Sequence, residues 1–136
     1  MAWIRNFILF AFWGFLCFAL RAEIVINEVC YDPVGSDEGW EWIELYNNGN
    51  TSVQLEGAKI LAGGSSFTLQ YTFPFFELRP HRYLLIGGAS ILNAQLYYNF
   101  SFQNGGSETD GIRYVSPEGT YTDTVLYDSP NTNQLF

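Results

Sequence analysis

Three acidic residues that lie close together in the sequence are the ones best suited to bind a metal ion. Asp32, Asp37 and Glu38 stand on either side of Gly35, in a stretch rich in turn-forming residues. Calcium takes about six to eight oxygen ligands, which loop carboxylates and backbone carbonyls supply. The chain lacks the alternating Asp spacing of an EF-hand loop. We therefore favour solvated or structural carboxylates, keep a calcium site at these three residues as the alternative, and expect no other cofactor.

Aromatic side chains are the second candidate for a binding site, since the chain has 4 Trp, 9 Tyr and 12 Phe. Exposed rings stack on sugars or anchor a protein partner. We select Trp40, Trp42 and Tyr98 as candidate ligand-binding residues, because each stands in a row of aromatic residues that a strand would present together. The competing interpretation, which we favour, is that such rings fill the core of the domain.

Residues suited to catalysis are scarce. A nucleophilic triad needs a base, and His81 is the only histidine of the chain; we expect it to be an exposed loop residue. The sequence contains no nucleophile elbow, phosphate-binding loop or zinc-ligand spacing. Cys30 lies in an apolar stretch and is expected to be a small buried side chain. The chain is therefore predicted not to be an enzyme.

The composition indicates one acidic globular domain. The chain has 136 residues, with 6 Lys and Arg against 14 Asp and Glu, and a formal net charge of −8. This length suits a single hydrophobic core, and a hydrophobic content of 48% is too high for a disordered chain. A nucleic-acid partner is excluded, because binding to phosphates requires a basic surface.

The first 22 residues have the pattern of a secretory signal and are not expected to belong to the fold. Arg5, in a short cationic start, precedes an apolar run over residues 7–20 and the small residue Ala22. As a helix this run would extend about 21 Å, short of the roughly 30 Å hydrocarbon core of a bilayer. We predict a signal peptide over residues 1–22, with an uncleaved anchor as the alternative. The domain over residues 23–136 would then be secreted or displayed at the cell surface.

From Glu23 onward, apolar and polar residues alternate in short runs that are separated by turn residues. We predict strands over residues 23–31, 40–47, 53–61, 66–72, 82–87, 97–103, 111–116 and 120–127. In the first strand, simple alternation assigns Val29 to the face opposite Ile24 and Ile26. In the third strand, Gly57 is interpreted as a bulge. Short strands at near-regular spacing, without helices between them, predict an antiparallel β-sandwich.

The sequence also resembles the lamin tail domain family. The residues that carry the resemblance are Glu23–Glu28, Tyr31–Pro33, Glu41–Asn47, Asn48-Gly49 and Val53–Ile60, with a looser match between Leu78 and Tyr127. The resemblance covers about residues 23–128 and implies an immunoglobulin-like antiparallel β-sandwich, in agreement with the strand pattern. It also implies that Glu28, Glu41 and Glu44 satisfy hydrogen-bond donors of the fold.

Two positions depart from the family pattern. Ala58 stands where the family usually has a tryptophan, so we expect Trp40 or Trp42 to fill that part of the core. The family usually adds a strand after the one that ends near Tyr127, and we expect the nine residues 128–136 not to supply it. The predicted sandwich would then lack its last strand and expose a sheet edge.

The resemblance implies an exported, non-catalytic lamin-tail-like module that interacts with a protein or a cell-surface component. Such a module would be a fragment of, or an accessory to, a larger extracellular protein. It would contact a membrane only through an uncleaved N-terminal segment. The alternative is a calcium- or carbohydrate-binding β-sandwich that uses the acidic loop or the exposed aromatic residues.

Overall fold

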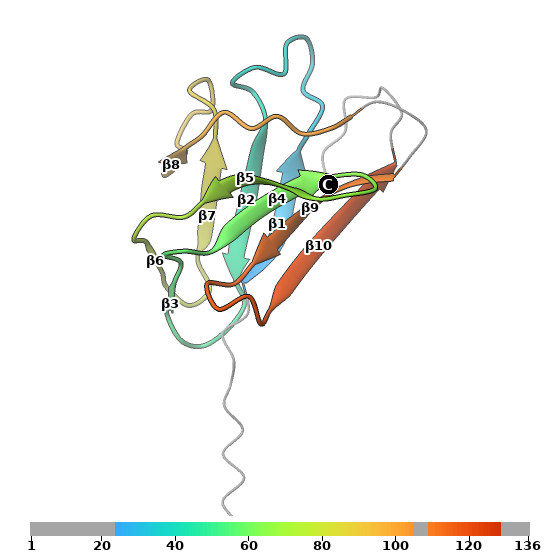
Figure 1. Ribbon diagram of the computed structural model, residues 1–136. Coiled ribbons are helices and arrows are strands. Elements are labelled where there is room, and N and C mark those ends of the chain that lie inside the picture. Colours follow the sequence, from blue (N-terminus) through green and yellow to red (C-terminus); the bar gives the residue numbers. More distant parts are fainter. Residues whose placement is uncertain (1–23, 105–108, 129–136) are drawn as a thin grey trace, which may run out of the picture.

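Every regular element in the computed structural model, which describes residues 24–104 and 109–128, is a β-strand (Figure 1). The strands are β1 (Ile24–Cys30), β2 (Trp42–Asn47), β3 (Val53–Gln54), β4 (Lys59–Gly63), β5 (Thr68–Thr72), β6 (Glu77–Leu78), β7 (Tyr83–Gly87), β8 (Leu96–Tyr97), β9 (Thr109–Val115) and β10 (Thr122–Asp128). Most of them follow from alternation. In β2, for example, Ile43 and Leu45 are buried, whereas Trp42 and Glu44 are partly exposed.

Two four-stranded sheets pack against each other, accompanied by the short β3-β6 pair. One sheet has the order β1-β2-β7-β8 and the other has the order β10-β9-β4-β5. In Figure 1 the strands of the second sheet run obliquely across those of the first. The paired strands are antiparallel except for β7 and β8, which are parallel. This arrangement confirms the predicted all-β, immunoglobulin-like sandwich.

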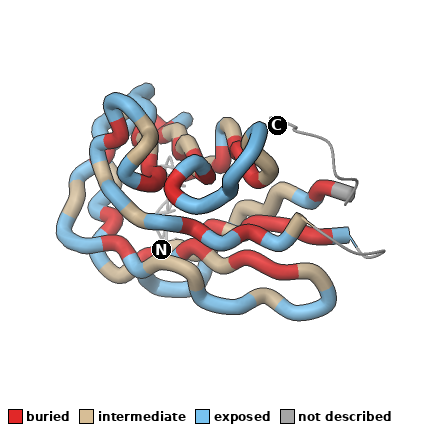
Figure 2. Tube along the Cα trace, turned by 90° about the horizontal axis from the view of Figure 1, so that it is seen from above, coloured by how far each residue is buried: buried red, intermediate tan, exposed pale blue. Residues whose placement is uncertain are grey.

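The core lies between the two sheets and consists of aliphatic and aromatic side chains. Inward-facing residues are paired across neighbouring strands, as Ile43 with Ile86 and Leu45 with Leu84, and all four are completely buried. Burying one such side chain stabilises a fold by about 1.5–3 kcal/mol. Figure 2 shows buried positions alternating with exposed ones along the chain. The buried rings of this core are those of Tyr31, Phe73, Phe100, Phe102, Tyr114 and Tyr127.

A β-bulge in β1 makes the predicted face assignment wrong. The pairing of β1 with β2 shifts between Ile26 and Glu28, so that Asn27 is the extra residue. An extra residue reverses the alternation of side chains beyond it, which turns Val29 to the core together with Ile26. The carboxylate of Asp123 on β10 accepts a hydrogen bond of 2.7 Å from the backbone N–H of Ile26 and so ties the bulge to the second sheet.

The predicted strand over residues 53–61 is two strands, β3 and β4, separated by a turn. Gly57 has a φ of +83°, which glycine adopts without strain, and Ala58 N–H donates to Leu55 O. The glycine therefore marks a turn and not a bulge. Ala58 is completely buried, but Trp40 and Trp42 do not replace the missing tryptophan: Trp40 is exposed, and Trp42 lies on the outward side of β2.

The predicted strand over residues 97–103 is also wrong in most of its length. Only Leu96 and Tyr97 form a strand, β8, and residues 98–104 continue without joining a sheet. Two-residue alternation of aromatic side chains shows that this segment is extended, but a ladder also needs a neighbouring strand in register. The segment instead leads from the first sheet to β9, in the second.

Two predictions concern residues that the structure does not describe. The signal peptide over residues 1–22 and the absence of a further strand after β10 both fall outside residues 24–104 and 109–128. Within those ranges, the chain forms no helix with the length and hydrophobicity needed to cross a membrane.

Candidate functional site

The acidic loop, residues 31–41, connects β1 to β2 at one end of the sandwich. Two of the predicted metal ligands converge there, because Asn104 Nδ2 donates to Asp32 Oδ1 at 3.2 Å and to Asp37 Oδ2 at 3.4 Å. The third, Glu38, is exposed. In the part of the chain that the structure describes, no three His, Cys, Asp or Glu residues are grouped so as to hold a metal ion. Asn104 thus links the two aspartates, and calcium binding by this loop stays a prediction.

Glu41, just before β2, is a buried carboxyl group of this same loop, with 1% of its surface exposed. Its two oxygens accept the backbone N–H of Phe102, at 3.0 Å for Oε1 and 3.3 Å for Oε2. Burial raises the pKa of Glu41 to about 8 against the opposing effect of this hydrogen bond, and the charges of Asp37 and Asp32 add to the rise. Glu41 therefore satisfies a backbone donor of the fold. Its charged form is disfavoured by burial, so its effect on stability depends on pH.

Residues 98–104, which we call the crossing segment, are held by side chains in place of a sheet ladder. Besides the bond to Glu41, the hydroxyl of Tyr127 donates to Gln103 O at 2.8 Å. The rings of Phe100 and Phe102 are buried and stack with their centroids 4.7 Å apart. The aromatic spacing of the sequence predicts that these rings lie together, but it does not show which side chains anchor the backbone.

The outer surface of the sheet β1-β2-β7-β8 carries several large rings, and we call it the outer aromatic face. On β2 and β7, the side chains that alternate with buried ones point outward, and they are Trp42, Glu44, Tyr46, Tyr83 and Leu85. Tyr46 and Tyr83 are directly paired, with ring centroids 4.6 Å apart. Tyr83 is 50% exposed. Trp40 is 51% exposed as well, but it belongs to the turn of the acidic loop and not to this sheet. This sheet surface therefore presents rings to solvent that the core does not use.

The three residues predicted to bind a ligand do not come together in one place. Trp42 is on the outer aromatic face, where a Cβ atom added to Gly87 would come within 2.8 Å of Trp42 Cβ. Tyr98 instead packs against the core, with its ring 5.1 Å from that of Tyr71. Sequence reasoning did not select Tyr83. The alternation over residues 82–87 would have identified it, because it separates Tyr83 from the buried positions of β7.

Two carboxylates lie side by side on the outer aromatic face. Glu28 on β1 is directly opposite Glu44 on β2, and Asn27 Nδ2 donates to Glu44 Oε1 at 2.8 Å. His81 lies at the border of the face, with Nδ1 3.4 Å from the hydroxyl oxygen of Tyr46. Like charges at opposite positions of a sheet destabilise it. The outer aromatic face is therefore suited to a partner that contributes positive charge.

Comparison with known proteins gives a fold and a family. No curated protein matches the sequence. Among solved structures, the archaellum periplasmic stator protein FlaG from Sulfolobus acidocaldarius is similar over 79% of this chain and 100% of its own, with 15% identity and a TM-score of 0.52. The complex of FlaF and FlaG from the same organism is similar over 91% of this chain and 100% of the matched chain, with 14% identity and a TM-score of 0.47. At these identities, the likeness to FlaG concerns the fold alone.

The family assignment comes from the sequence. The family model described as Lamin Tail Domain matches residues 19–134, which include all the described strands. The residues of β1 and β2 that carry the resemblance also build the bulge and part of the outer aromatic face, and Glu41, just before β2, makes the contact to Phe102. The chain belongs to the lamin tail domain family.

Proposed function

We propose that this lamin tail domain is an exported, non-catalytic module that binds a protein or a cell-surface component through its outer aromatic face. The exposure of Tyr83, whose ring lies against that of Tyr46 on the paired strand, carries the proposal. Aromatic residues are enriched at protein interfaces and dominate their binding energy. The rings here lie on a regular sheet, so a partner would meet them in a fixed arrangement and with little loss of conformational entropy.

Charge supports the same proposal and describes the partner. Glu28 and Glu44 are opposite each other on the outer aromatic face, and the whole chain has a formal net charge of −8. A basic partner surface would relieve the repulsion within this pair and would accelerate association. We therefore expect the partner to present lysine or arginine side chains to the face.

The surroundings of His81 support a role without catalysis. Its Nε2 lies 3.1 Å from Asn50 Oδ1 and its Nδ1 faces the Tyr46 hydroxyl. Both contacts lie at the exposed surface, where a reaction would not be shielded from water. His81 thus serves the outer aromatic face as a polar border residue.

Site-specific photo-crosslinking tests the proposal. A benzophenone amino acid placed at Tyr83 should give a discrete adduct when cells that produce the protein are irradiated. The matched control is the same replacement at Leu126, which is exposed on β10 in the other sheet. An adduct that forms at position 83 alone, and in lower yield when salt is added, supports a basic partner on the face. The absence of an adduct at position 83, or identical adducts at both positions, would contradict the proposal.

Export rests on the N-terminal pattern and needs a separate measurement. Mass spectrometry of the protein recovered outside the cytoplasm should find Glu23 as the first residue if the predicted signal is removed after Ala22. A full-length N-terminus in the membrane fraction would identify the alternative, an uncleaved anchor. Protein found only in the cytoplasmic fraction would contradict export.

The calcium-binding alternative is favoured by one observation, the convergence of Asp32 and Asp37 on Asn104. Under this alternative, the three oxygen-bearing side chains would rearrange around a calcium ion. Millimolar calcium should then raise the melting temperature of the wild type and not that of Asp37→Asn. An unchanged melting temperature would exclude calcium binding by the loop.

A further inference from the structure

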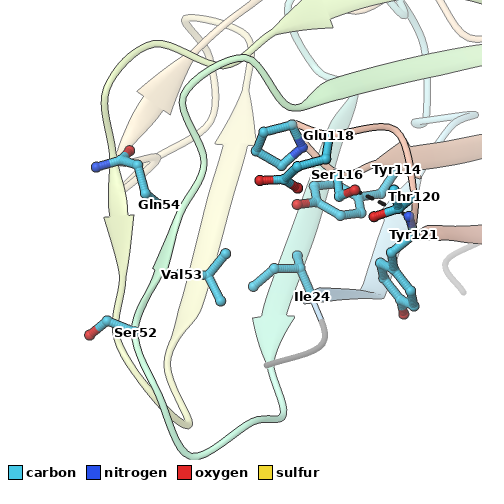
Figure 3. A pocket seen from close by; sticks show the side chains of 10 residues that line it. Ile24, Ser52, Val53, Gln54, Tyr114, Ser116, Glu118, Thr120 and Tyr121 are labelled. Atoms are coloured by element: carbon cyan, nitrogen blue, oxygen red, sulfur yellow. Dashed lines mark hydrogen bonds between the residues drawn. The ribbon is translucent and has the colours of Figure 1, made fainter. Parts of the chain in front are cut away.

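A pocket of about 450 Å³ opens between the two sheets at the end of the sandwich where β1 begins. Its walls come from Ile24, from the loop and strand around Val53, and from the hairpin that joins β9 to β10 (Figure 3). Ile24 and Tyr114 are buried and form its floor. Pockets for small ligands have volumes of about 300–1,000 Å³, so this one is large enough for a side chain or a small molecule.

The charge of the pocket limits what it can bind. Glu118 is the only charged residue among the ten that line it. Burial raises the pKa of the Tyr114 hydroxyl, and the nearby charge of Glu118 adds to the rise. An anion would meet this carboxylate without a compensating cation, so phosphates, sulfates and carboxylates are unfavourable ligands.

Hydrogen bonds to the backbone hold the pocket in shape. Ser116 Oγ accepts Tyr121 N–H at 3.2 Å, and Ser116 N–H donates to Tyr121 O at 2.9 Å. Gly119, with φ of +69°, closes the turn through a 2.9 Å bond from its N–H to Ser116 O. On the opposite wall, Gln54 Oε1 accepts two backbone N–H groups, at 2.9 and 3.2 Å. The backbone of Glu118 is thus held by a tight hairpin, and only its exposed side chain has to be ordered when a ligand binds.

Two tyrosine rings complete the lining. The rings of Tyr114 and Tyr121 have centroids 6.3 Å apart and are inclined by 55°. Aromatic faces attract ammonium and guanidinium groups. The apolar side chains of Ile24 and Val53 also line the pocket, where they would contact the methylene stem of such a group.

We infer that this pocket binds the cationic side chain of an arginine or lysine from a partner protein. The carboxylate of Glu118 would pair with the charge, the ring of Tyr121 would contact its face, and the apolar floor would contact the stem. The pocket is separate from the outer aromatic face, so the inference stands or falls independently of the crosslinking result at Tyr83. A neutral sugar is the competing ligand, because hydroxyl groups of Ser52 and Thr120 also line the pocket.

The test is a nuclear magnetic resonance titration of the full-length chain with N-acetylarginine methylamide. Matched probes are N-acetylnorleucine methylamide, which has an apolar side chain without the charge, and methyl glucoside. The arginine probe should shift the backbone amide signals of residues 52–54 and 114–121, with a dissociation constant in the millimolar range and a dependence on salt. The other two probes should leave those signals in place.

Two variants locate the interaction. Glu118→Gln keeps the size of the exposed side chain and should weaken binding of the arginine probe about fivefold, as expected for loss of a partly exposed ion pair. Glu56→Gln removes the same charge from an exposed residue that does not line the pocket and should leave the affinity unchanged. The inference is overturned if the arginine probe gives no local shifts, if norleucine or the glucoside binds as well, or if Glu118→Gln binds like the wild type.

Discussion

Replacing Glu41 by glutamine is expected to leave the stability of this domain nearly unchanged in acid and to raise it in alkaline solution. Glutamine has nearly the same shape as glutamate and keeps an oxygen that accepts the Phe102 N–H. In acid, where Glu41 carries its proton, the variant and the wild type should differ by no more than about 1 kcal/mol. In alkaline solution the wild type must hold a buried carboxylate, which glutamine avoids.

The size of the effect follows from the pKa of Glu41, which is about 8 in the folded protein against an ordinary value of 4.5. A carboxyl group whose pKa rises on folding contributes stability that is fully present below pH 4.5 and is lost as the pH rises through about 8. The slope is about 1.4 kcal/mol per pH unit, which amounts to at most about 5 kcal/mol over this interval. Entry of water into the acidic loop would reduce that figure.

Urea denaturation of the wild type and Glu41→Gln, followed by tryptophan fluorescence between about pH 5 and pH 9, measures the difference directly. Glu56→Gln is the matched control, because Glu56 is exposed. The free energy of unfolding of Glu41→Gln should exceed that of the wild type increasingly as the pH rises, while the control should follow the wild type. A difference that does not change with pH, or a variant that is less stable in alkaline solution, would refute the reasoning.

Three further substitutions test single contacts of the fold by the same denaturation assay at neutral pH. Tyr127→Phe removes only the hydroxyl that donates to Gln103 O and should cost about 1 kcal/mol; an unchanged midpoint would show that this bond does not hold the crossing segment. Gly57→Ala meets open space but forces alanine to a φ of +83°, so a loss of about 1 kcal/mol is expected; no loss would mean that the turn relaxes. Asp123→Ala leaves Ile26 N–H without its acceptor and should cost about 1–3 kcal/mol, and a smaller change would show that water replaces the carboxylate.

Alternation of apolar and polar side chains predicts those strands that have one face in the core and the other face toward solvent. In β2, and in β7 as far as Ile86, every second residue is completely buried and those between are not. The hydrophobic effect acts on each position separately, so such a pattern is visible in the sequence without knowledge of the neighbours. Ile43, Leu45, Leu84 and Ile86 are therefore core residues that the sequence alone identifies.

Interruptions of a strand are not predictable in the same way, because they depend on residues far away in the chain. The bulge at Asn27 is tied by Asp123, which is 97 positions from the Ile26 N–H that it accepts. Gly57 is compatible with both a bulge and a turn, and only the pairing of β3 with β6 and of β4 with β9 decides between them. Local propensity does not distinguish a bulge from a turn or from a regular strand at these positions, and tertiary contacts determine which one forms.

The candidate sites show the same limit for charges. Glu41 and Glu44 lie three positions apart in an extended stretch, so their side chains point to opposite faces of the sheet. The first becomes a buried acceptor because the crossing segment brings Phe102 N–H to it, and the second stays on the outer aromatic face opposite Glu28. Glu118 is in a third setting, beside two tyrosine rings. Three carboxyl groups that look alike in the sequence are therefore expected to respond differently because their surroundings differ. Glu41 should respond to pH, Glu44 to a basic protein surface, and Glu118 to a single cationic side chain.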